Sequence, residues 1–404
     1  MMSIPAIPLL KSRRLHLGVC GSVAAYKAID LMRLLQKAGI SVSVTLTESA
    51  SRFVTPLSFE ALGADPVYTG MFGQDEGLLF GHLQPGRTSD ALLIAPATAQ
   101  TIARLAQGMA DDMLSAQALA FKGPVLIAPA MNPSMWANPA TKHNISVLQE
   151  RGYTIIGPGS GVVACGDEGE GKLAPVEEIA FQAAAALCPD DYSDTKILVT
   201  LGPTWESWDS VRVWTNRSTG RMGSALASVA ALRGATVYAV AGPVSVPLPA
   251  SVHCKKVQSA EEMFSAASSI WETCTHGIFT AAVADFKPVP HTGGKFKKHG
   301  NLDGFSISLL PNPDILATLS ARKDKQKILG FAAETKDIEE AVQSKLLAKH
   351  ADLLAGNIVG QQEGGFGDAN NSMYVLDRNG KNAHWPLLPK EEVAWRLLDW
   401  LLTL

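Results

Sequence analysis

The sequence lacks the features of membrane, secreted and nucleic-acid-binding proteins. No apolar run approaches the roughly 20 residues that a membrane-spanning helix needs. The formal net charge is only −3, so no strongly basic surface is expected for nucleic acid or lipid headgroups. In the first 14 residues the basic side chains follow a short apolar stretch, which is the wrong order for a secretory signal. We therefore expect a cytoplasmic protein with neither a nucleic-acid nor a membrane partner.

Cysteine is also scarce. The chain has 5 cysteines, an odd number, and no two of them form a CxxC pair. A disulfide framework and a zinc site are therefore not expected, and a buried inert thiol is the ordinary interpretation of each cysteine. The chain also lacks a GxGxxG loop followed by an acidic ribose ligand, which argues against an NAD-dependent dehydrogenase.

The length and the apolar pattern predict two α/β domains. At 404 residues the chain is too long for one ordinary core. Short apolar runs alternate with helical patterns, as in parallel βαβ units. The alternation lapses at Cys188–Thr195, a polar segment with a proline, which we interpret as a linker. We expect two Rossmann-like, three-layer domains, residues 1–188 and 189–404.

The strands and helices follow from the periodicity of apolar residues. In the first half a helix is predicted over Val23–Lys37, and in the second half over Met222–Leu232 and Asp337–His350. The predicted strands of the first half are Leu15–Cys20, Ser41–Leu46, Ala91–Ala95, Val125–Ala128 and Thr154–Ile156, and those of the second half lie within 196–204, 235–242, 277–285, 327–334 and 351–357. Because open α/β sheets bind ligands at the carboxyl ends of their strands, the loops there are the places to look for chemistry.

Small and hydroxylated residues follow the first two strands. Gly18, Gly21 and Ser22 leave room for a phosphate against the N–H groups of the next helix, although a tight turn without a ligand is an equal alternative. Thr45 and Thr47 end the second strand, where their hydroxyls can meet a phosphate or simply reflect β-propensity and capping.

Four further positions in the first half are candidates for a site. Residues 97–100 are small enough for a flat ring to approach, and Asn132 can hold a carboxylate or form a turn. His82 has no second motif residue beside it, so it is either structural or catalytic. Cys165 lies in a segment with six glycines (157–175) that is typical of a mobile lid. An exposed thiol there, with a pKa near ~8.5, can donate a proton to a carbanion-like intermediate.

The second half has residues suited to a nucleotide. Asn216, Ser218, Thr219 and Gly220 precede a helix, which suits an anion as well as a plain capped loop. We expect Asp285 at the end of a buried strand, where a carboxylate can bind a metal, a ribose or a base.

The remaining candidates in the second half are basic or aromatic. Lys295, Lys297 and Lys298 follow two glycines and suit either a phosphate-binding flap or a solvated surface. Phe331 lies beside small residues that suit a base-stacking wall. Lys345 and Lys349 are four residues apart, on one helix face, and can reach one polyphosphate.

Four segments of the first half occur together in a known family. "GSVAAYK", "APATAQTIARLAQGMADD", "PAMNPSMW" and "ACGDEGEGKLAP" stand in the same order as in the flavin-dependent cysteine decarboxylases, which include the phosphopantothenoylcysteine decarboxylases. The resemblance implies His82 as the active-site histidine, Asn132 as the residue that holds the substrate carboxylate, and Cys165 as the proton donor. Gln100 and Lys172 depart from the asparagine and arginine usual there. The implied FMN contacts are Gly21, Ser22, Thr47, Ala97 and Thr98.

The second half, over about 195–400, resembles the phosphopantothenate–cysteine ligases through "GPT", "NRSTGRMG", "AAVADFKP", "KFKK", "NPDILA", "GFAAET" and "KLLAKHADLLAGN". The resemblance implies CTP, a divalent cation (Mg2+ or Mn2+) bound by Asp285, and an acyl-cytidylate that cysteine attacks. It implies that Asn216 handles the acyl intermediate and that Lys295 stabilises charge. Trp205, Ser207 and Arg217 depart from the family pattern. The implied CTP contacts are Thr280, Ala281, Asp285, Lys295, Pro313, Asp314, Ile315, Leu316, Phe331, Lys345 and Lys349.

Together the two resemblances imply consecutive steps of coenzyme A synthesis, with 4'-phosphopantothenate, L-cysteine and CTP as substrates. They also imply trimers of the first domain, dimers of the second and, if both interfaces form, a dodecamer. Two alternatives remain open: only one activity is live, the divergent ligase half being the weaker, or the chain binds flavin and nucleotide as a regulatory module. The presence of Cys165 and Asn132 counts against the second, since binding alone needs neither.

Overall fold

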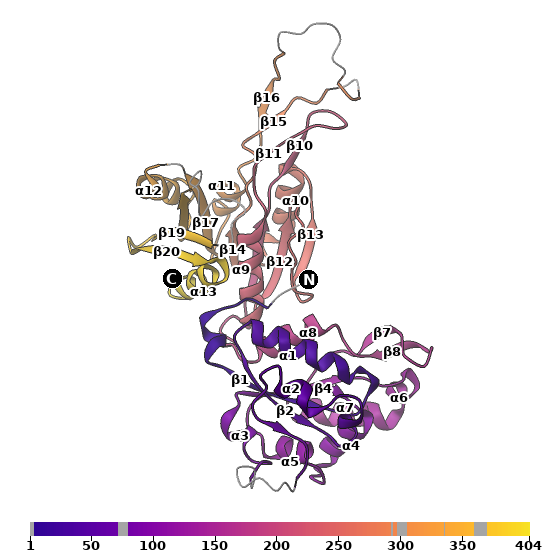
Figure 1. Ribbon diagram of the computed structural model, residues 1–404. Helices are drawn as coiled ribbons and strands as arrows, with labels where there is room; N and C mark the ends of the chain where they lie inside the picture. The colour runs from indigo at the N-terminus through magenta and orange to yellow at the C-terminus, as the bar shows by residue number, and fades with distance from the viewer. Residues whose placement is uncertain (1–3, 72–79, 292–293, 297–304, 335, 359–369) are drawn as a thin grey trace. The chain divides into compact units, whose positions relative to one another are not determined.

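The chain forms two compact units, Met1–Pro189 and Asp190–Leu404 (Figure 1). The structure, a computed structural model, describes residues 4–71, 80–291, 294–296, 305–334, 336–358 and 370–404. Within these residues no helix is long and apolar enough to cross a membrane. Each unit is described by itself below.

The first unit is built on a parallel sheet. Its strand order is β3-β2-β1-β4-β5-β6, and all of the described pairings are parallel. The predicted strands are confirmed to within two residues at either end. The strands are β1 (Arg14–Val19), β2 (Ser41–Leu46), β3 (Val67–Tyr68), β4 (Ala91–Ala97), β5 (Val125–Pro129) and β6 (Thr154–Ile155).

Helices pack against this sheet. A core cluster joins Leu92, Ile94 and Ile127 of the sheet to Ile102 of α4 and Leu148 of α7, while α1 and α8 pack on each other. The helices are α1 (Lys27–Lys37), α2 (Pro56–Glu60), α3 (Pro85–Thr88), α4 (Ala99–Gln107), α5 (Met113–Ala120), α6 (Pro133–Ala137), α7 (Pro139–Glu150) and α8 (Val176–Ala185).

The helix expected over Val23–Lys37 begins differently. Its first turn, Val23–Tyr26, is a 3-10 helix, and the α-helix starts only at Lys27. The side chain of Ser22 accepts a hydrogen bond from the backbone N–H of Ala24, which caps this tight turn. The apolar face of the expected helix is confirmed, because Ala28, Leu31 and Leu35 are buried.

The expected lid is an antiparallel hairpin. Its strands are β7 (Gly159–Val162) and β8 (Glu168–Lys172), and Cys165 lies in the connection between them. The hairpin packs against α6. Gly161, Gly169 and Gly171 have φ values of 138°, 153° and 151°, which only glycine adopts readily.

The second unit contains a larger, mixed sheet. Its strand order is β13-β12-β9-β14-β17-β18-β19-β20, parallel as far as β18 and antiparallel beyond it. The two-domain α/β class, each domain on a mostly parallel sheet, is therefore confirmed. The strands are β9 (Lys196–Leu201), β12 (Thr236–Ala241), β13 (His253–Lys256), β14 (His276–Phe279), β17 (Lys327–Glu334), β18 (Leu353–Ile358), β19 (Asn370–Asp377) and β20 (Asn382–Pro389).

Five described helices and two ribbons complete this unit. Helices α9 and α13 pack together, and α10 and α11 contact each other over a core that includes Trp271 and Leu319. The ribbons project from the sheet in Figure 1, and their aromatic side chains cluster where Trp208 stacks on Phe305. The helices are α9 (Arg221–Leu232), α10 (Ala260–Trp271), α11 (Ile315–Ser320), α12 (Ile338–Ala348) and α13 (Lys390–Leu402), and the ribbons are β10 (Trp205–Ser207) with β11 (Val213–Thr215) and β15 (Phe286–Pro288) with β16 (Leu309–Pro311).

The expected linker, Cys188–Thr195, is mostly exposed, but it is anchored to the second unit at Asp191 and Tyr192. Tyr192 is fully buried, and its hydroxyl donates a hydrogen bond to the carbonyl of Leu398 at 2.7 Å. The carboxylate of Asp191 accepts two hydrogen bonds from Arg233, at 2.8 and 2.6 Å. The segment lacks an apolar period, so its packing depends on partners that are remote in the sequence.

The strand expected over 277–285 is wrong beyond Phe279, where β14 ends. The next residues bond instead to the loop that follows β9: Ala282 donates its N–H to the carbonyl of Gly202, and Ala284 donates to the hydroxyl of Thr204. Asp285 is therefore not at the end of a buried strand. It lies exposed in a bend directly before β15.

Candidate active sites

The carboxyl edge of the first sheet brings together the candidate polar residues. Ser22, Thr47, Thr98 and Asn132 follow β1, β2, β4 and β5. Each side-chain oxygen accepts a backbone hydrogen bond from the turn that follows it, at distances between 2.8 and 3.3 Å. A hydroxyl that accepts one hydrogen bond still has a proton to donate. The capping interpretation is therefore correct, and it leaves Ser22 and Thr47 able to bind a phosphate oxygen.

The glycines of the first loop are explained by packing. A Cβ on Gly18 would lie 2.4 Å from Cδ1 of Leu114, and a Cβ on Gly21 would lie 2.8 Å from the backbone carbon of Ser49. Each glycine is thus required by a close approach inside the fold, whether or not a ligand is bound. Ala97 is likewise fully buried, whereas Thr98 is half-buried.

One expectation at this edge is wrong. Thr45 is fully buried, and its hydroxyl donates to Oε1 of Gln117 at 2.7 Å. It cannot meet a phosphate, because its side chain lies inside the domain and not at the sheet edge.

Asn132 and Cys165, 33 residues apart in the sequence, are in contact. Nδ2 of Asn132 donates to Sγ of Cys165 at 3.3 Å and to Oδ2 of Asp167 at 2.5 Å. The Cys165 thiol, which is exposed, donates to the same Asp167 oxygen at 3.5 Å. The hairpin thus places the thiol and the amide where one small substrate can touch both.

The base of the hairpin is held against the Asn132 loop. The backbone N–H of Met131 donates to the carbonyl of Gly171 at 2.9 Å. A Cβ on Gly171 would lie 2.5 Å from the carbonyl oxygen of Met131, so only glycine fits there. Asp167 was not predicted from the sequence. Its position two residues after Cys165 could have indicated that the two side chains are close together.

His82, Gln100 and Lys172 do not take part in the contact of Asn132, Cys165 and Asp167. His82 is half-buried in the turn before α3, and in the described part of the chain no hydrogen bond joins it to Asn132 or Cys165. Gln100, in the first turn of α4, and Lys172, on β8, are both exposed.

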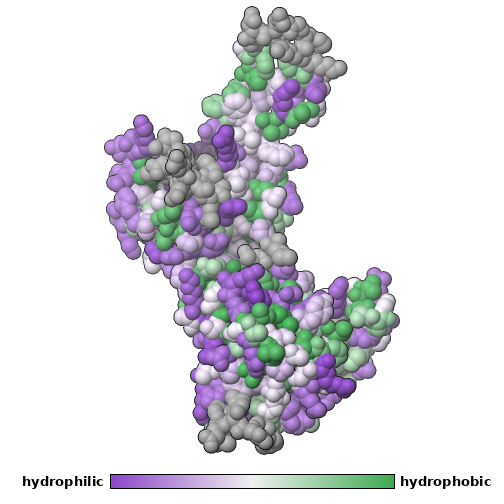
Figure 2. Space-filling model, in the orientation of Figure 1, coloured by the Kyte–Doolittle hydropathy of each residue, from purple (hydrophilic) through white to green (hydrophobic). Residues whose placement is uncertain are grey.

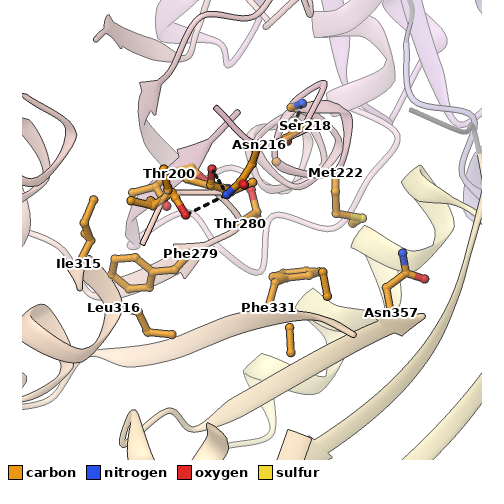
Figure 3. A pocket seen from close by; sticks show the side chains of 18 of the residues that line it. Thr200, Asn216, Ser218, Met222, Phe279, Thr280, Ile315, Leu316, Phe331 and Asn357 are labelled. Carbon is orange, nitrogen blue, oxygen red and sulfur yellow. Dashed lines mark hydrogen bonds between the residues drawn. The ribbon is translucent and has the colours of Figure 1, made fainter. Parts of the chain in front are cut away.

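A cavity of about 640 Å³ lies at the carboxyl edge of the second sheet. Figure 3 shows Asn216 and Thr280 on one side of it, Phe331 across from them, and Asn357 farther along the same wall as Phe331. The predicted residues that line it are Asn216, Ser218, Thr219, Gly220, Thr280, Ala281, Asp285, Pro313, Asp314, Ile315, Leu316, Phe331, Lys345 and Lys349.

The start of α9 and the Asn216 loop form one wall of the cavity. Asn216 donates through Nδ2 to the carbonyls of Ala282 and Val283, at 3.3 and 3.0 Å, so the amide is fixed in place. Helix α9 begins after Gly220 without a side-chain cap. The start of a helix attracts an anion through the partial positive charge of its N-terminus.

Two of the cations that line the cavity are paired with carboxylates. Nζ of Lys345 donates to Glu334 at 2.5 Å, and Lys349 forms an ion pair with Asp314, the N-cap of α11. A polyphosphate bound here would compete with these carboxylates for the two lysines.

Lys390 and Asn371 are among the residues of this cavity that were not predicted. Lys390 is only 6% exposed, although lysine is almost never buried, and it donates to Oδ1 of Asn371 at 2.7 Å. Lys390 is the first residue of α13 and Asn371 lies on β19, so no local motif connects them.

Lys295 does not line the cavity, and its exposed side chain lies near the tips of the ribbons. The next residue, Phe296, donates its backbone N–H to Asp209 at 3.0 Å. Burial alone would raise the pKa of Asp209, but hydrogen bonds from the backbone of Phe296, Val211 and Arg212 and from the Arg212 guanidinium hold it well below its usual range. Lys297 and Lys298 lie outside the described residues.

Known families match both units. The flavoprotein family matches residues 8–187, and the DNA/pantothenate metabolism flavoprotein C-terminal domain matches residues 192–404. The coenzyme A biosynthesis bifunctional protein CoaBC of Bacillus subtilis is 40% identical over 395 residues, 97% of each chain. The chain belongs to the CoaBC family of bifunctional coenzyme A biosynthesis proteins. It is accordingly a bifunctional enzyme of the pantothenate pathway, with a flavoprotein decarboxylase domain and a ligase domain.

Further members and solved structures are similar. The CoaBC protein of Escherichia coli K12 is 40% identical over 397 residues, 98% of each chain. The crystal structure of a CoaBC C-terminal domain covers 53% of this chain and 97% of its own, with 36% identity and a TM-score of 0.45. A phosphopantothenoylcysteine decarboxylase mutant complexed with pantothenoylaminoethenethiol covers 42% of this chain and 95% of its own, with 30% identity and a TM-score of 0.37.

Proposed function

We propose that residues 189–404 ligate cysteine to 4'-phosphopantothenate with CTP, and that residues 1–188 decarboxylate the phosphopantothenoylcysteine produced, with FMN. For the decarboxylase, the supporting observation is the contact of Asn132, Cys165 and Asp167 at the hairpin. For the ligase, it is the single cavity that collects the candidate nucleotide residues.

In the decarboxylase, Asn132 holds the substrate carboxylate through the Nδ2 that is bonded to Asp167 in this structure. When bound, FMN would supply the two-electron oxidation that makes CO2 a good leaving group and would return the two electrons after CO2 has left. Cys165 donates a proton to the product carbon, and the contact of its thiol with Asn132 supports this role. His82 forms part of the same site.

The residues at the sheet edge fit FMN. Ser22 and Thr47 keep a hydroxyl proton for the phosphate or ribityl chain, and Gly21 lies in the same loop as Ser22. Thr98 contributes its hydroxyl, and the buried Ala97 only its backbone.

In the ligase, the carboxylate of phosphopantothenate attacks the α-phosphorus of CTP, and a new P–O bond forms as pyrophosphate leaves. The cysteine amine then attacks the acyl carbon, and CMP leaves. Asn216 contacts the acyl group, the start of α9 with Lys345 and Lys349 holds phosphate oxygens, and Lys295 stabilises charge from the ribbon tips. Phe331, Thr280, Ala281 and residues 313–316 surround the nucleoside.

Asp285 is the proposed ligand of Mg2+ or Mn2+. No cluster of three or more His, Cys, Asp or Glu residues suited to a metal occurs in the described part of the chain. A single carboxylate fits Mg2+, which keeps several waters and is held mainly by substrate phosphates.

The test combines phosphopantothenate, cysteine, CTP and Mg2+ with the purified protein. We expect a yellow protein that releases both pyrophosphate and CO2. Pyrophosphate without CO2 would leave only the ligase proposal standing. A colourless protein that releases neither would refute both, and equal rates with ATP would refute the preference for CTP.

We also propose that each domain self-associates, the first as a trimer and the second as a dimer, with a dodecamer as the closed assembly. Figure 2 shows apolar surface near α1 and α2. Val23 and Tyr26, in the 3-10 turn before α1, and Leu57 of α2 are 57, 58 and 68% exposed. On the ribbons, Trp214 and Phe286 are each 49% exposed. Light scattering that finds a monomer at micromolar concentration would refute this assembly.

A further inference from the structure

We propose that Gln117 is a positioning residue for the decarboxylase site, because it holds the turn that carries His82. This inference rests on the proposed function, in which His82 belongs to the active site.

Gln117 lies in a chain of buried polar side chains. His16, Ser43, Thr45 and Gln117 are each 0–2% exposed. The His16 ring contacts the hydroxyls of Ser43 and Thr45, both at 2.8 Å. Thr45 donates to Oε1 of Gln117 at 2.7 Å, and Nε2 of Gln117 donates to the carbonyl of Gly81 at 3.1 Å. This series of hydrogen bonds thus ends at Gly81, the residue directly before His82.

The protons of this chain have a consistent direction. Burial lowers the pKa of His16 to about 3, so the ring is neutral at physiological pH. Because the Thr45 hydroxyl donates to Gln117, it accepts from Nε2–H of His16, which also lies 3.2 Å from Oε1 of Gln117. Nδ1 of His16 then accepts from Ser43. The chain therefore fixes the Gln117 amide with its nitrogen toward Gly81.

Helix α5 bonds to this turn before His82 and packs against α3 after it. Gln117 bonds to Gly81 before the histidine, and after it a Cβ on Gly86 would lie 3.1 Å from the carbonyl oxygen of Ala120. The helix is itself fixed at its start by a capping box between Asp112 and Ser115. In the described residues no hydrogen bond holds the His82 ring, so its position depends on the backbone of this turn.

A purely structural explanation accounts poorly for this chain. An apolar side chain fills a buried position without the desolvation of an amide, a hydroxyl and an imidazole. The hydrogen-bonded side chains fix the orientation of the Gln117 amide and hold the last acceptor of the series in place. That acceptor is the Gly81 carbonyl, in the turn of His82.

The test is Gln117→Met in the full-length, FMN-loaded protein. The substitution keeps the length of the side chain and removes the N–H donor to Gly81. We expect the kcat of decarboxylation to fall between about tenfold and 100-fold with little change in KM, because misplacing a catalytic group by about 1 Å has effects of that size. The limb of the pH–rate profile that reports His82 should shift as well. Ser43→Ala, which breaks the far end of the chain, is the matched control and should lower the Tm without changing kcat or the pH profile.

A double-mutant cycle shows whether Gln117 acts through His82. We expect Gln117→Met to cause no further loss of kcat in a His82→Asn background. Wild-type kcat and pH profile in Gln117→Met, or an equal loss in both backgrounds, would overturn the inference. If Gln117→Met does not fold, Gln117→Leu, which also removes the N–H donor to Gly81, decides the question by the same readouts.

The cycle also separates this inference from the proposed function. Full activity of His82→Asn alone would remove His82 from the proposed site. A slow His82→Asn enzyme with a fully active Gln117→Met enzyme would overturn only the positioning role of Gln117.

Discussion

At the scale of single residues, the side chains proposed for the chemistry of the first domain come from separate segments that the fold brings together. Asn132 follows β5 and Cys165 lies in the β7–β8 connection, yet the amide and the thiol are 3.3 Å apart. Asp167 accepts hydrogen bonds from both. A substrate carboxylate that bound to Nδ2 of Asn132 would therefore replace the carboxylate of Asp167 as its acceptor.

The proton donor can be tested by Cys165→Ser. A serine hydroxyl is a far weaker acid than a thiol, so we expect CO2 release to continue while the reduced product fails to appear. Mass spectrometry of the product and CO2 measurement check this, with pyrophosphate release as the control for the ligase. Wild-type formation of the reduced product would rule out Cys165 as the proton donor.

His16 predicts how stability depends on pH. Its folded-state pKa of about 3 lies below the ordinary 6.5, so below pH 6.5 the unfolded chain binds a proton that the folded chain does not. The free energy of unfolding should then fall as pH drops below 6.5, by up to about 1.4 kcal/mol per pH unit from this group, and level off near pH 3. Urea unfolding of the wild type and of His16→Gln at pH 7 and pH 5 checks this. Equal slopes in the two proteins would contradict it.

At the scale of elements, glycines decide how the β7–β8 hairpin meets the Asn132 loop. Gly171 has a φ of 151° and touches the backbone of Met131, whereas Gly166 has a φ of 90° with nothing near its missing Cβ. Any other residue would be strained at both positions, but only a Cβ at Gly171 would also push the hairpin away from the backbone of Met131.

Gly171→Ala should therefore reduce decarboxylation far more than Gly166→Ala does. We expect a loss of about 100-fold in kcat for the first variant, since a 1 Å displacement of a catalytic group has effects of that order. Steady-state kinetics with phosphopantothenoylcysteine measure both variants, and the ligase rate of each reports folding of the remaining chain. Equal losses would show that only backbone strain matters.

The predicted elements were confirmed where the pattern is local. The strands of the first half and the helices α9 and α12 follow directly from apolar periodicity. The error at 277–285 has a tertiary cause. The apolar run continues after Phe279, but its N–H groups bond to the loop after β9 and leave the sheet.

At the scale of the whole molecule, each unit has its own buried core. We expect residues 1–189 and 190–404 to fold separately and to keep decarboxylation and ligation, respectively. The second fragment should need residues 190–195, because the buried Tyr192 and the Asp191–Arg233 pair lie there. A fragment beginning at Lys196 is the control.

That control should unfold at a lower temperature than the 190–404 fragment. Loss of Tyr192 opens a cavity and leaves Arg233, which is 1% exposed, without the carboxylate of Asp191. Differential scanning calorimetry of the two fragments checks this. The same Tm in both would contradict the packing role of this segment.

The sequence alone determined the α/β class, the two halves and the segments from which each site is built. It could do so because apolar period and motif order are local properties of a chain. Only the tertiary structure decided which candidates meet. It buried Thr45, placed Lys295 away from the cavity, and added Asp167, Lys390 and Asn371, because contacts between remote segments depend on strand order and loop path. The hydrogen bond from Gln117 to the Gly81 carbonyl is of the same kind, since its two partners are 36 residues apart and no local pattern connects them.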